Sequence, residues 1–157
     1  MIGVAYACKD MHSKGKQLRC LKQMSIPKIR EKNLFKNIKE EVNIMYDLIG
    51  VDGVCKLLDI IINPGKEIIL VLPFYYLTDL WNYMKVRPGR HLTETQAKKV
   101  FTQLVDTFIE IHNREIMHRD IKPENILVVN DDLDVCLSDF GLATRVGPYP
   151  DYEATRT

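Results

Sequence analysis

The chain has 157 residues, of which 46% are hydrophobic and 27% charged, and its formal net charge is +1. This length corresponds to one ordinary domain or to part of a larger one. No run of about 18 or more apolar residues occurs, which excludes a transmembrane helix. The N-terminus, MIGVAYACKD, lacks the basic and apolar regions of a secretion signal. We therefore expect a soluble intracellular protein of the cytoplasm or nucleus that has no contact with a membrane.

The cysteine spacing and the charge distribution disfavour two further classes of protein, those that bind zinc and those that bind nucleic acid. The four cysteines form no CxxC pair, which disfavours a zinc site and fits reduced thiols; they are Cys8, Cys20, Cys55 and Cys136. Residues 1–40 carry ten Lys/Arg against three Asp/Glu, whereas residues 41–157 are net acidic. Because these lysines are scattered without interleaved aromatic residues, they fit a solvated face better than a nucleic-acid interface.

The first third of the chain is predicted to contain two strands and a helix. Residues 3–9 and 17–24 are the expected strands, separated by the turn-rich segment HSKGK. Residues 30–49 are the expected helix, which Gly50 would end. Its apolar residues recur at helical spacing, at Leu34, Ile38, Val42, Met45 and Leu48.

Short strands and a short helix are predicted before and after a longer helix. The apolar runs 54–61 and 68–72 flank the turn NPGK and predict a hairpin. A short helix is expected to start at Thr78. Two further strands, 126–129 and 135–138, are expected on either side of a turn at NDD.

The longer helix has the clearest start in the sequence. Thr93 followed three residues later by Gln96 is the pattern of a capping box. Behind it, a predicted buried face contains Val100, Leu104, Phe108 and Ile111, widened by Phe101, Val105 and Ile109. Strands and hairpins therefore precede the longer helix, which predicts an α+β chain with two lobes rather than one interleaved sheet.

Two sequence motifs identify a family resemblance. HRDIKPEN at 118–125, followed by DFG at 139–141, resembles the catalytic signature of eukaryotic protein kinases. The resemblance implies a bilobal kinase fold that is partial at both ends. Residues 1–74 would form the N-lobe without its first strand and most of the glycine-rich loop. Residues 75–157 would form the hinge and the start of the C-lobe, through the activation segment.

The resemblance assigns chemistry to the residues of these motifs. Phosphoryl transfer depends mainly on positioning and charge neutralisation. Asp120 would accept the proton of the attacking hydroxyl, and Lys122 would neutralise charge on the transferring group. Asn125 and Asp139 would hold Mg²⁺, which prefers oxygen ligands. A lysine two residues after the catalytic Asp is typical of serine/threonine kinases, and His118 is expected to anchor the loop.

The nucleotide-binding lysine has two candidates. Lys9 ends the stretch YACK but precedes Glu41 by too many residues for one strand, a link and half a helix. Lys22 ends the stretch RCLK and precedes Glu41 by 19 residues, as expected in kinases. Lys22 is therefore predicted to pair with Glu41, with Glu40 as an exposed helix charge. Gly3 would be the last glycine of the loop that covers the phosphates.

The stretch ILVLPFYYLTD resembles a kinase hinge. Leu72 falls at the gatekeeper position, and the Pro73 carbonyl and Tyr75 N–H would pair with the adenine edge. Proline loses nothing here, because this position contributes its carbonyl. Asp79 falls where the family places a ribose-binding acid. The adenine base would lie between two apolar side chains, Cys20 and Leu127.

The C-terminal tail resembles the activation segment of the CMGC group, in which Tyr-x-Ala-Thr-Arg recurs. Tyr152 is a candidate phosphorylation site, and Pro150 stands where mitogen-activated kinases place a phosphorylated threonine. Thr155 would contact the catalytic residues and help to form the substrate groove. Arg119 beside the catalytic Asp would bind a loop phosphate bidentately.

A second affiliation stays open. EVNIMY and VLPFYY resemble the activator-dependent kinases that trigger DNA replication, although the long insertion usual after their DFG stretch is not seen. On either affiliation, the expected function is a Mg²⁺/ATP-dependent serine/threonine kinase that acts on a protein substrate, with an activator subunit as a further partner. The alternative is a catalytically inactive, truncated kinase that acts as a binding or scaffold module.

Overall fold

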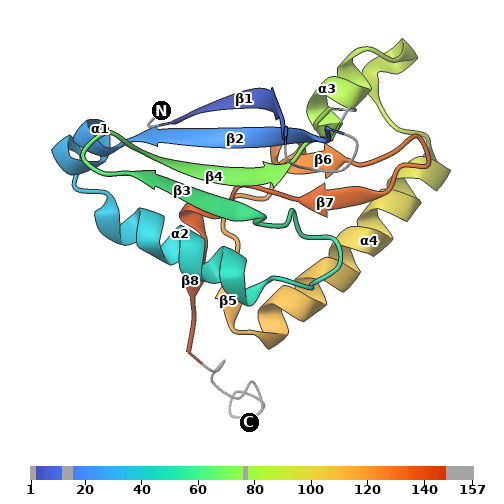
Figure 1. The fold of residues 1–157 in the computed structure, drawn as a ribbon. Helices are drawn as coiled ribbons and strands as arrows, with labels where there is room; N and C mark the ends of the chain where they lie inside the picture. The colour runs from blue at the N-terminus through green and yellow to red at the C-terminus, as the bar shows by residue number, and fades with distance from the viewer. Residues whose placement is uncertain (1–2, 12–15, 76–77, 148–157) are drawn as a thin grey trace, which may run out of the picture.

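The N-terminal half is built on a four-stranded antiparallel sheet. The computed structural model describes residues 3–11, 16–75 and 78–147, and Figure 1 shows the arrangement. The strand order is β1-β2-β4-β3, with bounds Gly3–Lys9, Leu18–Ser25, Glu67–Pro73 and Asp59–Asn63 in that order. β2 is central, so Lys22 is flanked by Ala5 of β1 and Leu70 of β4.

The helix expected over residues 30–49 is two helices. α1 spans Ile26–Glu31 and α2 spans Phe35–Asp47. Asn33, between them, has a left-handed backbone with φ of 53°, which a continuous helix cannot contain. α2 lies under the sheet, with Ile38, Ile44 and Met45 among its buried residues (Figure 1).

The predicted hairpin is present, but its first strand begins later than expected. β3 and β4 flank the turn at 64–66, in which Gly65 has φ of 73°. Residues 54–58 are apolar for another reason: Val54, Cys55 and Leu57 are buried, and Val54 makes a parallel bridge to Leu137. Burial alone does not separate a strand from a packed loop, which explains the incorrect boundary.

The C-terminal half contains a long helix and two small sheets. α3 spans Leu80–Lys85, two residues later than expected, because Asp79 is its extended N-cap. α4 spans Glu94–Asn113 and has the predicted capping box. Two-stranded sheets β5–β8 and β6–β7 complete this half, with bounds Ile116–Met117, Thr144–Arg145, Ile126–Val128 and Val135–Leu137. Single 3₁₀ turns occur at Pro88–Arg90, Pro123–Asn125 and Phe140–Leu142.

α4 has one buried face and one exposed face. Val100, Leu104 and Ile111 are buried on the side that contacts β5 and β7. The expectation that a second row widens this buried face is wrong in the described structure, because Phe101, Val105 and Ile109 are 69%, 39% and 53% exposed. The second row is therefore a separate, solvent-exposed row on α4.

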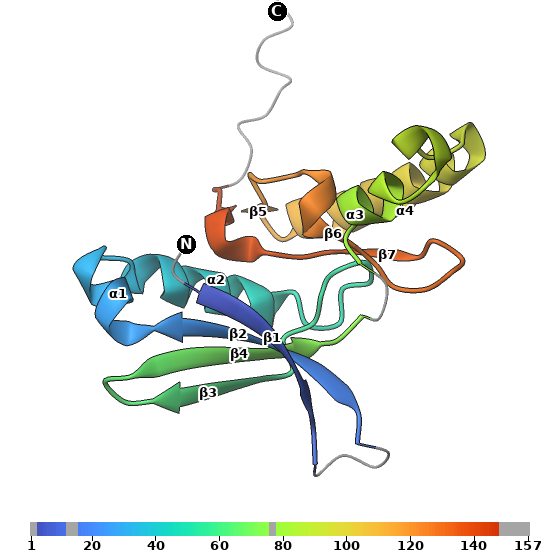
Figure 2. The same cartoon turned by 90° about the horizontal axis from the view of Figure 1, so that it is seen from above.

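One buried cluster connects the two halves. It runs from Met24 and Ile44 beneath the sheet through Leu137 and Phe140 to Ile111 on α4. Figure 2 shows α2 between the sheet and the 3₁₀ turn that follows β7. Within the described ranges, no helix has the length and apolarity needed to cross a membrane.

Candidate active site

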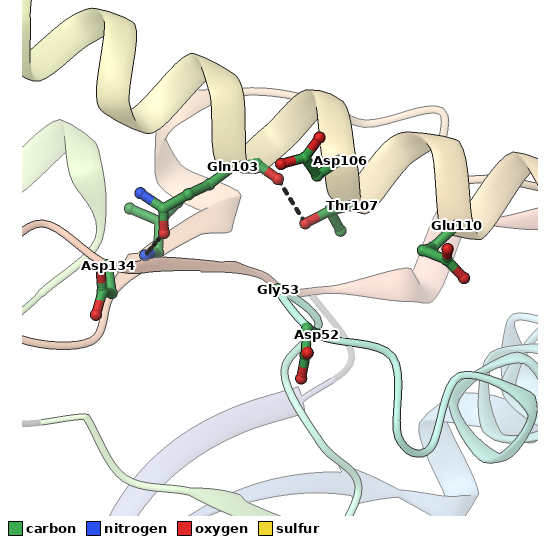
Figure 3. A pocket seen from close by; sticks show the side chains of 8 residues that line it. Asp52, Gly53, Gln103, Asp106, Thr107, Glu110 and Asp134 are labelled. Atoms are coloured by element: carbon green, nitrogen blue, oxygen red, sulfur yellow. Dashed lines mark hydrogen bonds between the residues drawn. The ribbon is translucent and has the colours of Figure 1, made fainter.

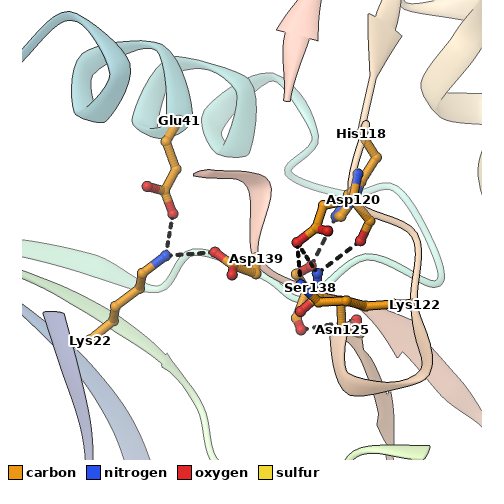
Figure 4. A network of polar contacts seen from close by, with 8 residues as sticks. All are labelled: Lys22, Glu41, His118, Asp120, Lys122, Asn125, Ser138 and Asp139. Atoms are coloured by element: carbon orange, nitrogen blue, oxygen red, sulfur yellow. Dashed lines mark hydrogen bonds and ion pairs between the residues drawn. The ribbon is translucent and has the colours of Figure 1, made fainter. Parts of the chain in front are cut away.

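A three-residue charge group lies between the sheet and α2. Lys22 Nζ lies 2.6 Å from Glu41 Oε1 and 2.8 Å from Asp139 Oδ1 (Figure 4). The predicted ion pair between Lys22 and Glu41 is therefore present. Glu41 is 4% exposed, so a deeply buried carboxylate fixes the direction of the lysine side chain.

The electrostatics of this group keep Lys22 and Asp139 charged. Burial by itself lowers the pKa of Lys22, but the charges and hydrogen bonds of Glu41 and Asp139 outweigh it, and the pKa is raised. For Asp139, burial raises the pKa, but the charge and hydrogen bond of Lys22 outweigh it, and the pKa is lowered. The site therefore holds the Lys22 ammonium group beside the ionised carboxylate of Asp139 at neutral pH.

A second polar group is formed by the loop at 118–125. Lys122 Nζ donates to Asp120 Oδ2 at 2.7 Å, and Asn125 Nδ2 donates to the same oxygen at 2.9 Å. These hydrogen bonds, that of Lys122 foremost, lower the pKa of Asp120. Asp120 is thus an ionised carboxylate held by two donors that come from its own loop.

His118 anchors this loop, as expected from the sequence. It is 2% exposed, and its Nε2 lies 2.9 Å from the Ser138 carbonyl oxygen while its Nδ1 accepts from the Asp120 N–H. These two partners require a neutral ring with its proton on Nε2. Burial is the main cause that lowers the pKa of His118 and favours this neutral form. The ring also packs edge-on against Phe140.

Ser138 joins the loop to the segment that carries Asp139, a role that neither sequence motif predicts. Its N–H and its Oγ both donate to the Asn125 carbonyl oxygen, at 2.8 and 3.0 Å. Asp139 follows with a left-handed backbone, φ of 60°, which turns the chain towards Lys22. A serine before DFG has no distinctive sequence signal, because its role depends on the facing loop.

The predicted adenine-site residues lie on neighbouring strands. Cys20 and Leu72 are directly paired across β2 and β4. Asp79 and Leu127 form an antiparallel bridge where the chain leaves the hinge. Asp79 also caps α3, because its side chain accepts from the N–H and the side-chain amide of Asn82. Tyr75 follows β4, and burial first, then nearby Cys136, raises the pKa of its hydroxyl.

The remaining predicted residues lie at the ends of the strand ladders, beside the 3₁₀ turn at Phe140–Leu142, or outside the described ranges. Gly3 pairs with Met24 at one end of the β1–β2 ladder, and Pro73 pairs with Arg19. Arg119 Nε donates to the Leu142 carbonyl at 2.8 Å. The candidate regulatory residues of the tail, Tyr152 and Thr155, lie outside the described residues.

The interpretation of Glu40 as a simple exposed charge is wrong. Glu40 is half-buried, and its Oε1 accepts from Thr144 Oγ1 at 3.0 Å. The two residues are 104 positions apart, so the sequence contains no local signal of the contact.

A cavity elsewhere in the described part of the chain is separate from the two polar groups described above. Its volume is about 330 Å³, and it lies between α4 and residues 52–53 (Figure 3). Gln103, Asp106, Thr107 and Glu110 of α4 line it, with Asp134 and Val135 across from them. No member of either polar group described above lines this cavity.

A model of the protein kinase domain family matches residues 1–157. This chain belongs to the protein kinase domain family. It is 35% identical over 138 residues to CBL-interacting serine/threonine-protein kinase 24 of Arabidopsis thaliana, covering 87% of this chain and 29% of that protein. It is 30% identical over 132 residues to the SNF1-like protein kinase ssp2 of Schizosaccharomyces pombe, covering 84% and 22%. It is 29% identical over 145 residues to serine/threonine-protein kinase par-4 of Caenorhabditis elegans, covering 92% and 23%.

The chain thus spans less than a third of the length of these curated relatives. The α+β arrangement of an antiparallel sheet with α2, followed by the helical part, is the corresponding part of the bilobal kinase fold. The CMGC affiliation is not confirmed by these relatives.

Proposed function

We propose that the chain is the ATP-binding and catalytic part of a Mg²⁺-dependent serine/threonine protein kinase. It would transfer the γ-phosphoryl group of ATP to Ser or Thr hydroxyls of a protein. Residues 1–74 would be the N-lobe, and residues 75–157 the hinge and the first part of the C-lobe. The single observation that carries this proposal is the contact of Lys22 with both Glu41 and Asp139, beside the Asp120 loop (Figure 4).

The donor set fits a magnesium ion. Asp139 supplies a carboxylate whose pKa is lowered, with burial opposing and Lys22 favouring the charged form. Asn125 turns its amide nitrogen to Asp120, so its amide oxygen is the atom left for a cation. Oxygen ligands of this kind suit Mg²⁺, which binds through a few protein carboxylates together with substrate phosphates. When bound, the ion would neutralise charge on the phosphates.

The chain's own residues would perform the remaining steps. Lys22, directed by Glu41, would contact the nucleotide phosphates. Asp120 would accept the proton of the substrate hydroxyl, and its lowered pKa keeps it ionised for that role. Lys122, 2.7 Å from Asp120, would place positive charge beside the group in transfer. Cys20, Leu72, Pro73, Tyr75, Asp79 and Leu127 would line the nucleoside part of the site, with Gly3 near the phosphates.

Regulation would act through residues of the tail. Tyr152 would be a phosphorylation site, Thr155 would shape the substrate groove, and Arg119 would bind a loop phosphate. An activator subunit is part of this proposal, because both family affiliations considered above include kinases that require one.

The test compares Asp139→Asn with Asp131→Asn, a control at an exposed position in the turn after β6. Thermal unfolding of the full chain is followed with and without saturating ATP and Mg²⁺, together with phosphate transfer to a basic protein substrate. A binder of Mg·ATP gains stability by mass action, about 2.7 kcal/mol at 100 times the dissociation constant. We expect Asp131→Asn to retain this gain and Asp139→Asn to lose it. No gain for the unmodified chain would contradict the proposal.

A binding or scaffold module is the second candidate, favoured by one observation. Phe101, Val105 and Ile109 form an exposed apolar row along α4. An apolar surface of this kind often contacts another protein. A chain that binds Mg·ATP but transfers no phosphate to any substrate would favour this second function.

A further inference from the structure

Two side-chain contacts connect α2 to β8, the strand that follows the DFG turn. Thr144 Oγ1 donates to Glu40 Oε1 at 3.0 Å, and Arg145 forms an ion pair with Asp47. Glu40 and Asp47 are seven residues apart, so they lie two helical turns apart on the same face, about 10 Å along the axis. Two attachment points at this separation restrict both the tilt and the rotation of α2.

β8 is in turn joined to the catalytic loop. Thr144 pairs with Met117 and Arg145 with Ile116 in the β5–β8 sheet. Met117 directly precedes His118, whose ring holds the loop that carries Asp120. A further backbone hydrogen bond, from the Val146 N–H to the Glu115 carbonyl at 2.8 Å, closes the end of this ladder.

The position of Glu41 depends on this same helix. Glu41 is adjacent to Glu40, and it is the buried partner of Lys22. A rotation of α2 that separated Glu40 from Thr144 would also move Glu41 relative to Lys22, because a helix turns as a rigid body over so short a distance. The α2–β8 contacts therefore link the nucleotide lysine to the catalytic loop.

We propose that Glu40 and Thr144, supported by Asp47 and Arg145, are positioning residues that hold α2 where Glu41 reaches Lys22. The proposal rests on the kinase function proposed above and adds the residues that assemble its site. Glu40 and Thr144 carry most of the effect because they are half-buried. The Asp47–Arg145 pair is about half exposed, and an exposed ion pair contributes little by itself.

The test replaces Thr144 in the full chain. Thr144→Val keeps the shape and the strand preference but removes the hydroxyl, whereas Thr144→Ser keeps the hydroxyl and is the matched control. Glu40→Gln is a second control, because its amide oxygen still accepts from Thr144. The readouts are amide hydrogen exchange of residues 35–47 and the apparent KM for ATP.

We expect Thr144→Val to exchange about three- to tenfold faster across α2, the effect of one lost hydrogen bond. The KM for ATP should rise more than kcat falls, and Thr144→Ser and Glu40→Gln should behave like the unmodified chain. Equal exchange in Thr144→Val and Thr144→Ser would overturn the proposal. An equal increase of the exchange rate in all three variants would also overturn it, because that would indicate a general loss of packing.

The two proposals fail separately. If the unmodified chain neither binds Mg·ATP nor transfers phosphate, the kinase function fails, while hydrogen exchange still decides whether the α2–β8 contacts hold the helix. If the unmodified chain is active and Thr144→Val changes neither readout, only the positioning role fails. Should Thr144→Val fail to fold, Glu40→Met replaces it, because it removes the acceptor of the Thr144 hydroxyl while Glu40→Gln, its matched control, retains one. Exchange across α2 should then be faster in Glu40→Met than in Glu40→Gln, and equal exchange in the two would overturn the proposal.

Discussion

Glu41 is a buried carboxylate whose principal partner is the Lys22 amine, 2.6 Å away. Removal of the lysine leaves this charge inside the protein without its cation. We expect Lys22→Met to lower the free energy of unfolding by about 1–3 kcal/mol, measured by urea titration. The double variant Lys22→Met/Glu41→Met should be more stable than the single one, because no buried charge is left unpaired. A double variant less stable than Lys22→Met would contradict this account of the pair.

Asp120 provides a test that separates chemistry from binding. Asp120→Asn keeps the size of the side chain and an oxygen that accepts from Lys122 and Asn125, but it cannot take up a proton. Loss of a general base typically lowers the rate by about 10²–10⁴-fold. We expect kcat to fall within this range, while the stabilisation by Mg·ATP in thermal unfolding is retained. Unchanged kcat would remove Asp120 from its proposed role.

Gly53 is predicted to be intolerant of a side chain. It has φ of 74°, and an added Cβ would overlap Thr107 Oγ1 on α4. Gly53→Ala should therefore lower the free energy of unfolding by about 2–4 kcal/mol, because of the left-handed backbone and the overlap together. Gly50→Ala is the matched control, because Gly50 has φ of 89° and no atom within 4 Å of an added Cβ. It should cost only about 1–2 kcal/mol. If urea titration gave the same loss in free energy of unfolding for Gly53→Ala and Gly50→Ala, the overlap with Thr107 would be shown to be unimportant.

His118 should make stability depend on pH. Burial lowers the pKa of His118 in the folded chain, so the unfolded chain takes up a proton first as the pH falls below the ordinary value of 6.5. Folding stability contributed by the neutral ring is therefore present above this value and is lost below it, by at most about 1.4 kcal/mol per pH unit.

His118→Gln can still donate to the Ser138 carbonyl but does not titrate. Between pH 7.5 and 5.5, we expect its free energy of unfolding to fall less steeply than that of the unmodified chain. Both chains are compared by urea titration at each pH, so that other titrating groups cancel. Parallel slopes would mean that His118 is protonated as readily in the folded chain as in the unfolded one.

The sequence by itself determined the elements with a local chemical cause. The start of α4 was predictable because Thr93 and Gln96 cap it through bonds within a single turn. β1 was predicted with its observed bounds, and the pairing of Lys22 with Glu41 followed from a family pattern of fixed spacing. The kinase family was identified from two short motifs, and the family match supports that identification.

The tertiary structure alone decided which apolar residues are buried and which distant side chains meet. Phe101 and Val54 are both apolar, yet Phe101 is exposed and Val54 is buried, because burial depends on what packs against each element. The contact of Glu40 with Thr144 joins residues 104 positions apart and has no periodic signal in the sequence. Local bonds depend on neighbouring residue types, which can be read along the chain. Long-range contacts depend on how α2, β8 and the loop at 118–125 pack together, which only the folded chain specifies.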